Sequence, residues 1–291
     1  MQIVIIGAQG QVGSELVRRA PGLGYEVLAW DLAELDITDT EAVDHALNVS
    51  GADVVINAAA YTAVDKAEQE PERAFAANRD GPAHLATACN RLNIPLLHLS
   101  TDYVYDGRKP GPYREEDPVA PLGVYGASKL AGDEAIGRLL PRHLILRVSW
   151  VFGIHGHNFV KTILRLARER EELRIVADQY GCPTYAGDIA DALLELAERT
   201  AELDAQQAWG VYHYCGQPAT TWHGFTEAIV EEARHHEALR VRTITPIATA
   251  DYLTPAARPL NSVLDCEKLV TRFGLQPRSW REGLRMMLAN P

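Results

Sequence analysis

Short apolar segments alternate with longer amphipathic ones along the first half of the chain. Apolar runs lie at residues 3–6, 26–30, 53–57 and 96–102, and the first of them is rich in β-branched residues. Between and after them, apolar positions recur with the three-to-four-residue spacing of helices at residues 39–48, 71–92 and 124–140. This repeated alternation through Arg147 predicts an α/β fold, in which helices cover both faces of a parallel, doubly wound sheet.

A glycine-rich turn follows the first apolar run. Gly7, Gly10 and Gly13 are evenly spaced, and residues 15–19 turn helical. Such glycines allow a tight turn, a close approach of a pyrophosphate and close helix packing, while the helix N-terminus attracts phosphates. The next strand ends at Asp31, where a Rossmann-type fold places an acid against the adenosine ribose. We therefore predict a dinucleotide site.

The pattern changes after Arg147, where loops become longer. A helix is predicted at residues 158–170 and a short strand at residues 174–176. We expect residues 1–150 to form the dinucleotide-binding domain and residues 151–291 to form mainly a smaller substrate-binding lobe. This boundary is discontinuous if the apolar run at residues 210–214 returns to the main sheet.

A tyrosine and a lysine stand four residues apart inside the predicted helix 124–140. Tyr125 and Lys129 therefore share one helix face. A nearby ammonium stabilises a phenolate and lowers the tyrosine pKa from its ordinary value of about 10, so the pair can exchange a proton with a carbonyl substrate. Tyr105 and Lys109 have the same spacing, but Gly107 and Pro110 predict a loop there, where this spacing brings no shared face.

Polar residues end two of the predicted strands. Thr62 lies just beyond the small residues at 58–60, and Thr101 and Asp102 end the strand at 96–102. The carboxyl ends of parallel strands meet at one edge of the sheet, so these side chains should converge at a ligand crevice.

Two further residues are candidates for substrate contacts. Trp150 could stack on a sugar ring, and Arg258 could grip a diphosphate with two hydrogen bonds. The alternative interpretations are a core aromatic residue and an ordinary surface arginine.

The composition limits the classes of partner that the protein can bind. A formal charge of −11 and a pI near 5.4 argue against nucleic acid and anionic membranes. The four cysteines form no Cys-x-x-Cys pair, and no run of 18 apolar residues or basic leader is present. We expect a soluble, cytoplasmic protein without a disulfide framework.

These motifs together resemble the extended short-chain dehydrogenase/reductase family. In that family the threonine positions the substrate carbonyl, the tyrosine exchanges the proton, and the lysine contacts the nicotinamide ribose and tunes the tyrosine. The resemblance assigns these catalytic roles to Thr101, Tyr125 and Lys129. It implies NADH or NADPH, bound by Gly7, Gly10, Gln11, Val12, Gly13, Asp31, Asp36, Ile37, Ala60, Tyr61 and Thr62 together with Tyr125 and Lys129.

Blocks at residues 57–68, 100–107, 121–126, 147–150, 178–184 and 257–262 are similar to family members that reduce the C4 ketone of a dTDP-linked deoxysugar. The resemblance implies such a small molecule as substrate, held by Thr101, Asp102, Trp150, Asn158 and Arg258. Some members form magnesium-dependent homodimers through an early glutamate. Glu15 is the candidate for that glutamate here, but its partners cannot be assigned from the sequence.

The same fold supports other functions. Sugar-nucleotide epimerases and dehydratases share it, and the family's dehydratases carry an Asp-Glu pair directly after the threonine, where this chain has Asp102 and Tyr103. The regulatory β subunit of methionine adenosyltransferase is also similar to this reductase group. A non-catalytic role is therefore a further alternative, which the intact Thr101, Tyr125 and Lys129 set argues against only in part.

Overall fold

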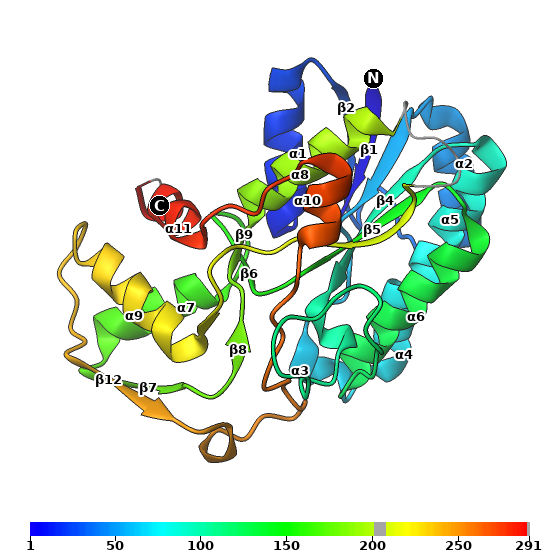
Figure 1. Cartoon of the computed structure of the whole chain (residues 1–291). Coiled ribbons are helices and arrows are strands. Elements are labelled where there is room, and N and C mark those ends of the chain that lie inside the picture. Colours follow the sequence, from blue (N-terminus) through cyan, green and yellow to red (C-terminus); the bar gives the residue numbers. More distant parts are fainter. Residues whose placement is uncertain (201–207, 290–291) are drawn as a thin grey trace.

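The computed structural model describes residues 1–200 and 208–289 (Figure 1). Its centre is a six-stranded sheet of order β2-β1-β3-β4-β5-β10, and neighbouring strands pair in parallel. The strands are β1 (Gln2–Ile6), β2 (Glu26–Trp30), β3 (Val54–Asn57), β4 (Leu96–Thr101), β5 (His143–Val148) and β10 (Gly210–His213). The strand order reverses between β1 and β3, which confirms the doubly wound parallel sheet.

Helices cover both faces of this sheet (Figure 1). One layer contains α1 (Gln11–Arg19), α8 (Ala186–Arg199) and α10 (Glu267–Phe273), and the other contains α2 (Thr40–Ser50), α5 (Gly81–Leu92) and α6 (Val124–Leu139). Successive side chains of β1 alternate between the layers, since Ile3 and Ile5 face the first and Val4 and Ile6 the second. Because both layers are apolar, the strand reads as a continuous hydrophobic run.

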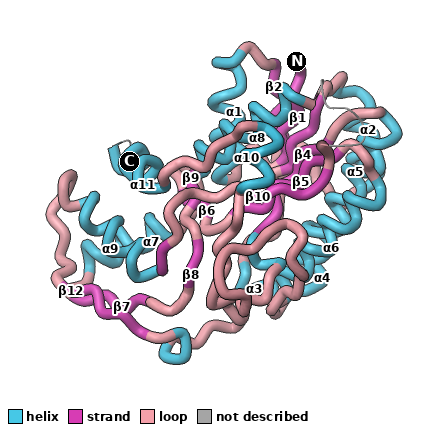
Figure 2. The backbone as a smooth tube through the Cα atoms, in the orientation of Figure 1, coloured by secondary structure: helices cyan, strands magenta, loops and turns pink. Residues whose placement is uncertain are grey.

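A smaller lobe packs beside the carboxyl end of the sheet (Figures 1 and 2). Its core joins Phe152, Phe225 and Trp280. The lobe contains α7 (Phe159–Glu169), α9 (Trp222–Ala233), α11 (Trp280–Ala289), β6 (Val151–Phe152), β7 (Glu172–Val176), β8 (Tyr180–Gly181), β9 (Thr184–Tyr185), β11 (Thr220–Thr221) and β12 (Thr243–Ile247). The chain after residue 150 serves both parts, because β10 pairs with β5 in the main sheet and α8 packs on α1.

The helix predicted at residues 71–92 is interrupted. It consists of α4 (Pro71–Phe75), a π-type turn η2 (Ala76–Asp80) and α5. Pro82 lacks an N–H, and its ring clashes with the carbonyl four residues earlier in an α-helix, which favours the wider turn before it. The remaining short elements are η1 (Ala20–Leu23), α3 (Val64–Ala67), η3 (Asp102–Val104) and η4 (Thr249–Asp251).

The cysteines are less dispersed than the sequence suggested. All four are buried and free. Cys215 Sγ lies 3.7 Å from Cys266 Sγ. Hydrogen bonds with Cys182 and Cys266, together with burial, raise the pKa of the Cys215 thiol, so it stays protonated.

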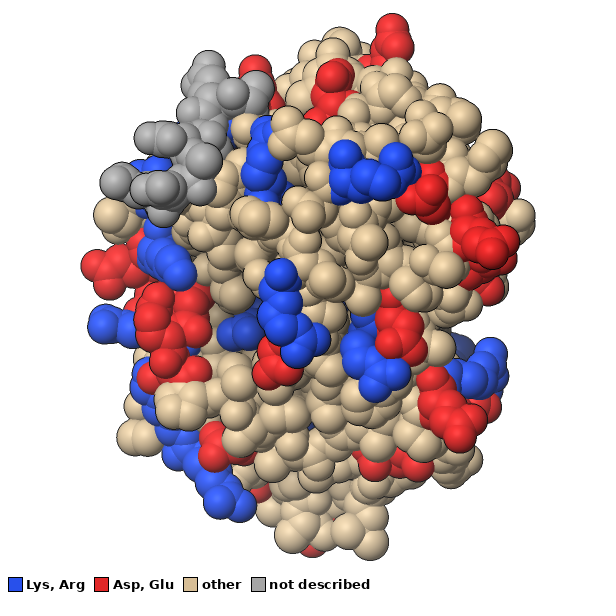
Figure 3. Space-filling view, turned by 90° about the vertical axis from the view of Figure 1, so that its right-hand side faces the viewer, with Lys and Arg blue, Asp and Glu red and all other residues tan. Residues whose placement is uncertain are grey.

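Charged side chains on the face shown in Figure 3 are interspersed among uncharged ones. Exposed ion pairs join neighbouring elements, as where Arg91 of α5 contacts Asp44 of α2 at 2.8 Å. Within residues 1–200 and 208–289, no helix combines the length and the apolar character needed to cross a membrane.

One ion pair is buried between α6 and the sheet. Arg147 Nε of β5 lies 3.1 Å from Asp133 Oδ2 of α6, and both side chains are nearly inaccessible. Ser100 Oγ donates to the same carboxylate oxygen at 2.9 Å, and Arg147 Nη1 donates to the Tyr105 hydroxyl at 2.9 Å. These contacts tie α6 to β4 and β5.

Replacing only one partner of this pair should be costly. Arg147→Met leaves the Asp133 carboxyl buried without its cation, so the free energy of unfolding should fall by about 3–5 kcal/mol. Arg91→Met, at the exposed pair with Asp44, should cost about 0–1 kcal/mol. Urea unfolding followed by circular dichroism measures both. Equal losses of unfolding free energy in the two variants would contradict the claim that the buried pair contributes more to stability than the exposed pair.

Candidate active site

The glycine turn lies against the end of β3. Gly7 has φ +77°, and a Cβ there would come within 2.5 Å of the Ala59 nitrogen. A Cβ on Gly13 would lie 2.0 Å from the Gly7 carbonyl oxygen. Gly10 is the N-cap of α1, and no side chain caps that helix, so its first N–H groups are available to a phosphate. The helix begins at Gln11, four residues earlier than predicted.

Asp31 lies beside this turn, as the sequence predicted. Its Oδ2 accepts a hydrogen bond from the Gln9 N–H at 2.8 Å, and its Oδ1 accepts from the Leu32 N–H at 2.8 Å. Asp36 is exposed and accepts from Thr38, whereas Ile37 is buried. Of these carboxylates, Asp31 is the one held next to the glycine turn.

A buried asparagine that sequence reasoning missed links the cofactor edge to α6. Asn78 Oδ1 accepts from the Tyr61 N–H at 2.8 Å, while its Nδ2 donates to the Tyr61 carbonyl and to Ser128 Oγ, each at 3.0 Å. Ala60 and Thr62 flank Tyr61 in this segment. The signal for Asn78 was the Asn-Arg-Asp-Gly-Pro break in the helical pattern.

Thr101 and Tyr125 meet at the carboxyl end of β4. The Thr101 hydroxyl is close enough to Tyr125 to lower its pKa, and the Tyr103 ring meets that of Tyr125 edge to face with centroids 5.8 Å apart. This approach depends on Gly126, because a Cβ there would lie 2.2 Å from the Tyr103 carbonyl oxygen. Lys129 follows one turn later on the same helix. Thr101 and Tyr125 therefore lie close together, and Lys129 shares the helix α6 with Tyr125.

The electrostatics of the pair differ from the prediction. Burial raises the pKa of Tyr125 to about 12, partly opposed by the hydrogen bond with Thr101. Burial lowers the pKa of Lys129 to about 8. Lys129 Nζ donates to the Leu99 carbonyl at 2.7 Å and lies 3.0 Å from His98 Nε2. The predicted lowering of the Tyr125 pKa by an adjacent ammonium is therefore wrong for this structure, where removal from water has the largest effect on that pKa.

Asp102 is a buried acid beside the crevice. Burial raises its pKa to about 7, against hydrogen bonds from Ser262 and Thr101 that lower it. Thr101 Oγ1 lies 3.0 Å from Asp102 Oδ1 and also accepts from the Tyr103 N–H at 3.2 Å. Thr101 is therefore oriented from both sides.

Trp150 has an unusual backbone and a covered face. Its φ of +46° is rare for a bulky residue, and such strain concentrates at functional sites. The ring stacks on Trp222 with centroids 3.5 Å apart, and Trp222 Nε1 donates to Gln179 Oε1 at 3.1 Å. Gly181 lies against the Trp150 ring, since a Cβ on Gly181 would come within 2.3 Å of that indole. Stacking of a sugar on Trp150 stays a prediction.

The other two expected substrate residues have protein partners. Arg258 Nη2 pairs with Asp65 at 2.9 Å. Asn158 Nδ2 donates to Gln11 Oε1 at 3.0 Å and to the Gly153 carbonyl at 2.8 Å. Asn158 thus joins the glycine turn to α7, which it also caps.

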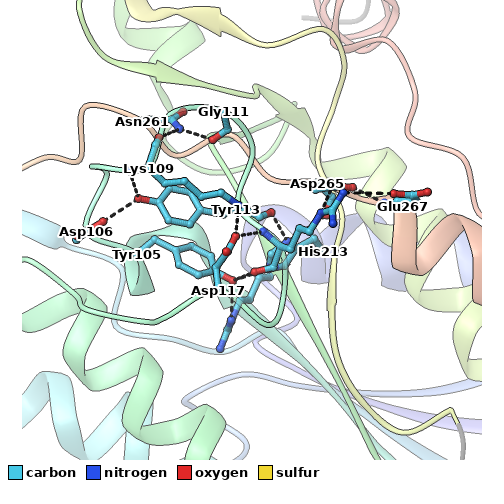
Figure 4. Close-up of polar contacts among 12 residues, drawn as sticks. Tyr105, Asp106, Lys109, Gly111, Tyr113, Asp117, His213, Asn261, Asp265 and Glu267 are labelled. Atoms are coloured by element: carbon cyan, nitrogen blue, oxygen red, sulfur yellow. Dashed lines mark hydrogen bonds and ion pairs between the residues drawn. The ribbon is translucent and has the colours of Figure 1, made fainter.

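A polar network braces the loop that follows Asp102 (Figure 4). Tyr113 stacks on Tyr105 with centroids 4.3 Å apart, and its hydroxyl donates to Asp106 at 2.8 Å. His213 of β10 lies 2.9 Å from the Tyr105 hydroxyl through Nε2. Asn261 Nδ2 donates to the carbonyls of residues 109 and 111. Asn261 therefore fixes this loop to the C-terminal part of the chain.

Glu15 is paired with two arginines of its own helix, α1. It is buried, and its Oε2 is held by Arg18 at 2.6 Å and Arg19 at 2.9 Å. Arg19 also pairs with Asp191 at 2.8 Å. Within the described part of the chain, no cluster of three or more His, Cys, Asp or Glu residues suits a metal.

The whole chain, residues 1–291, matches the family model described as the RmlD substrate binding domain. It is 46% identical over 290 residues to dTDP-4-dehydrorhamnose reductase of Aggregatibacter actinomycetemcomitans, covering 99% of this chain and 98% of that protein. It is 41% identical over 293 residues to the Escherichia coli K12 dTDP-4-dehydrorhamnose reductase, covering 99% and 97%. The crystal structure of the Bacillus anthracis dTDP-4-dehydrorhamnose reductase in complex with NADP superposes with a TM-score of 0.92 at 34% identity, covering 100% and 99%.

Proposed function

Because this chain belongs to the RmlD substrate binding domain family, we propose that it reduces the C4 ketone of dTDP-4-dehydro-L-rhamnose with NADH or NADPH. The product is dTDP-L-rhamnose, a nucleotide sugar used to build cell-surface polysaccharides. The observation that carries the proposal is the proximity of the Thr101 and Tyr125 side chains at the carboxyl end of β4, with Lys129 one turn further along the same helix. Reduced nicotinamides and nucleotide sugars are cytoplasmic metabolites, so we place the enzyme there. A homodimer stays a prediction.

The residues present fit a nicotinamide dinucleotide. The turn at Gly7 to Gly13 admits a pyrophosphate closely, and the uncapped first turn of α1 offers it N–H groups. Asp31 can accept hydrogen bonds from the adenosine ribose hydroxyls once it exchanges its contact with Gln9. When bound, the nicotinamide supplies the hydride that adds to C4 of the sugar.

Thr101 and Tyr125 handle the ketone oxygen. A carbonyl placed between the two hydroxyls accepts hydrogen bonds from both once the Thr101 hydroxyl turns away from Asp102 Oδ1, and these bonds stabilise negative charge as it develops on the oxygen. Tyr125 then transfers its proton to that oxygen, so the C4 carbon gains the hydride, the oxygen gains the proton, and the ketone becomes an alcohol. The raised pKa of Tyr125 keeps the phenol protonated at neutral pH, which is the form this step needs.

Binding of the dTDP moiety requires local exchanges of partners. Arg258 must release Asp65 to grip the diphosphate, and its planar guanidinium suits two phosphate oxygens. Asp102 lies beside Thr101 and can orient a sugar hydroxyl. Trp150 and Asn158 lie where the lobe meets the crevice, and we propose that they complete the substrate site.

Tyr125→Phe should separate chemistry from binding. The variant lacks the hydroxyl that protonates the ketone oxygen, so kcat should fall by about 10² or more, while cofactor affinity barely changes. Tyr25→Phe, just before the amino end of β2, serves as a matched control with full activity. Steady-state NADPH oxidation and calorimetric cofactor binding provide the two readouts. Near-normal turnover by Tyr125→Phe would sink the assignment.

Asp31→Ala should alter the choice of cofactor. The carboxylate favours the free 2′-hydroxyl of NADH and repels the 2′-phosphate of NADPH, so its removal should shift the ratio of kcat/KM values toward NADPH. We expect both cofactors to work in the unmodified enzyme with a mild preference. Asp44→Ala, on the outer surface of α2, controls for the lost charge. A ratio unchanged by Asp31→Ala would place the carboxylate away from the ribose.

Reduction should occur without dehydration. Tyr103 stands where the family's dehydratases have a glutamate, and burial raises its pKa, so it is a poor acid and a poor base for elimination. With dTDP-glucose and catalytic NAD⁺ we expect no 4-keto-6-deoxy sugar. With dTDP-4-dehydrorhamnose we expect one equivalent of NAD(P)H to be oxidised. A panel of dTDP- and UDP-4-keto sugars followed by NADH absorbance tests this. Formation of the 4-keto-6-deoxy sugar, or inertness toward the keto sugar, would overturn the proposed function.

A further inference from the structure

Helix α6, which carries Tyr125, begins at a glycine. Its N-cap is Gly123, which has no side chain to cap it, and residues 124–127 of its first turn include no acid. The N–H groups of a first turn have no partner inside their own helix, so each needs one from elsewhere. For Val124 that partner comes from a distant segment, because Glu68 Oε1 accepts its N–H at 2.8 Å.

Two glycines let neighbouring groups approach this end of α6 closely. A Cβ on Gly123 would lie 2.6 Å from Glu68 Oε1, and a Cβ on Gly126 would lie 2.2 Å from the Tyr103 carbonyl oxygen. Tyr125 stands between the two glycines, and its ring packs edge to face on that of Tyr103. The turn that carries the proton donor is therefore held by a carboxylate from one segment and by a ring and a carbonyl from another.

The segment that carries Glu68 is anchored by contacts of its own. Glu68 is the C-cap of α3, and Asp65 of the same short helix pairs with Arg258 at 2.9 Å. Just before α3, the Asn78 side chain holds the N–H and the carbonyl of Tyr61. These contacts do not involve Glu68. Replacing Glu68 should therefore release the first turn of α6 while α3 and the cofactor edge stay in place.

We propose that Glu68 is a positioning residue of the reductase, whose carboxylate caps α6 from outside and keeps the Tyr125 hydroxyl beside Thr101. This inference deepens the proposed function and rests on it. A carboxylate suits the role, because it accepts a strong hydrogen bond and also offsets the positive end of the helix dipole. Precise placement matters, since a displacement of about 1 Å can slow a reaction by about 10²-fold.

Substitutions of Glu68 separate chemistry from binding. Glu68→Leu removes the acceptor for the Val124 N–H, so kcat should fall by about 10- to 100-fold. The Kd for NADPH should change by less than about twofold, because Asn78 holds the cofactor edge independently. Glu68→Gln keeps an amide oxygen as acceptor, so its kcat should stay within about threefold of the original. Equal losses of kcat in the leucine and glutamine variants would overturn the proposal.

Two further variants guard against a general loss of structure. Gly123→Ala places a methyl group where Glu68 Oε1 lies, so it should displace the carboxylate and lower kcat as Glu68→Leu does. It supplies a second route if Glu68→Leu fails to fold. Asp39 caps α2 by accepting from the N–H groups of residues 41 and 42. Asp39→Ala therefore also removes a helix cap, and it should lower the urea midpoint without lowering kcat.

A double-mutant cycle tests whether Glu68 acts through Tyr125. In the Tyr125→Phe background the hydroxyl to be positioned is gone, so adding Glu68→Leu should lower the residual kcat by less than about threefold. A role in general stability would lower kcat by the same factor in both backgrounds. That additive result would overturn the proposal.

Tyrosine-selective NMR gives a readout that needs no turnover. The chain has 11 tyrosines, and Tyr125→Phe identifies the signal of interest in ¹³C-tyrosine-labelled, full-length enzyme. Because the Tyr125 ring packs against that of Tyr103, its signals depend on the placement of the first turn of α6. They should shift in Glu68→Leu and Gly123→Ala and keep their original positions in Glu68→Gln. Unchanged Tyr125 signals in the first two variants, once circular dichroism shows them folded, would overturn the proposal.

The outcomes distinguish this inference from the proposed function. If the Tyr125 signals respond as expected while the unmodified enzyme oxidises no NAD(P)H with dTDP-4-dehydrorhamnose, the proposed reaction fails and the positioning of Tyr125 by Glu68 stands. If the unmodified enzyme reduces the keto sugar and folded Glu68→Leu does so at the same kcat, the role of Glu68 fails and the proposed reaction stands.

Discussion

Burial of ionisable side chains determines their pKa values and their contacts at the active-site edge of the sheet. The polar face of α6 packs on β4 and β5, so Lys129, Asp133 and Arg147 are all buried against the sheet. Each group then depends on a neighbour with matching hydrogen-bond chemistry, because an unpaired buried charge is costly. The same desolvation raises the pKa of Tyr125 and lowers that of Lys129. Packing of one helix thus sets both the position and the protonation of the groups proposed to act on the ketone.

The glycine turn depends on the absence of side chains rather than on burial of charge. Gly7 and Gly13 allow the turn to touch β3 and itself so closely that any side chain would collide with backbone. This brings the N-terminus of α1 to the switch point between β1 and β3, where a dinucleotide meets the carboxyl ends of the strands. Asn78 then connects this edge to α6. Backbone contacts and one buried amide therefore fix the glycine turn relative to helix α6, which carries Tyr125.

The sequence predicted what depends on local spacing. Gly7, Asp31 and the Tyr125/Lys129 pair could be recognised because strand, turn and helix periodicities place them without knowledge of the rest of the chain. It could not predict contacts between distant segments, such as the stack of Trp150 on Trp222. Nor could it give pKa directions, which depend on burial by the whole fold. Local spacing suggested an ammonium acting on a phenol, whereas the packed structure desolvates both groups.

The central claim is that a hydride reaches C4 of a dTDP-linked keto sugar while the proton comes from Tyr125. The most direct measurement is turnover of dTDP-4-dehydrorhamnose with NADPH deuterated at the transferred position, followed by NMR of the product sugar. Our account predicts dTDP-rhamnose with deuterium on C4 and nowhere else on the sugar ring. Product without deuterium at C4, or deuterium at another ring carbon, would contradict it.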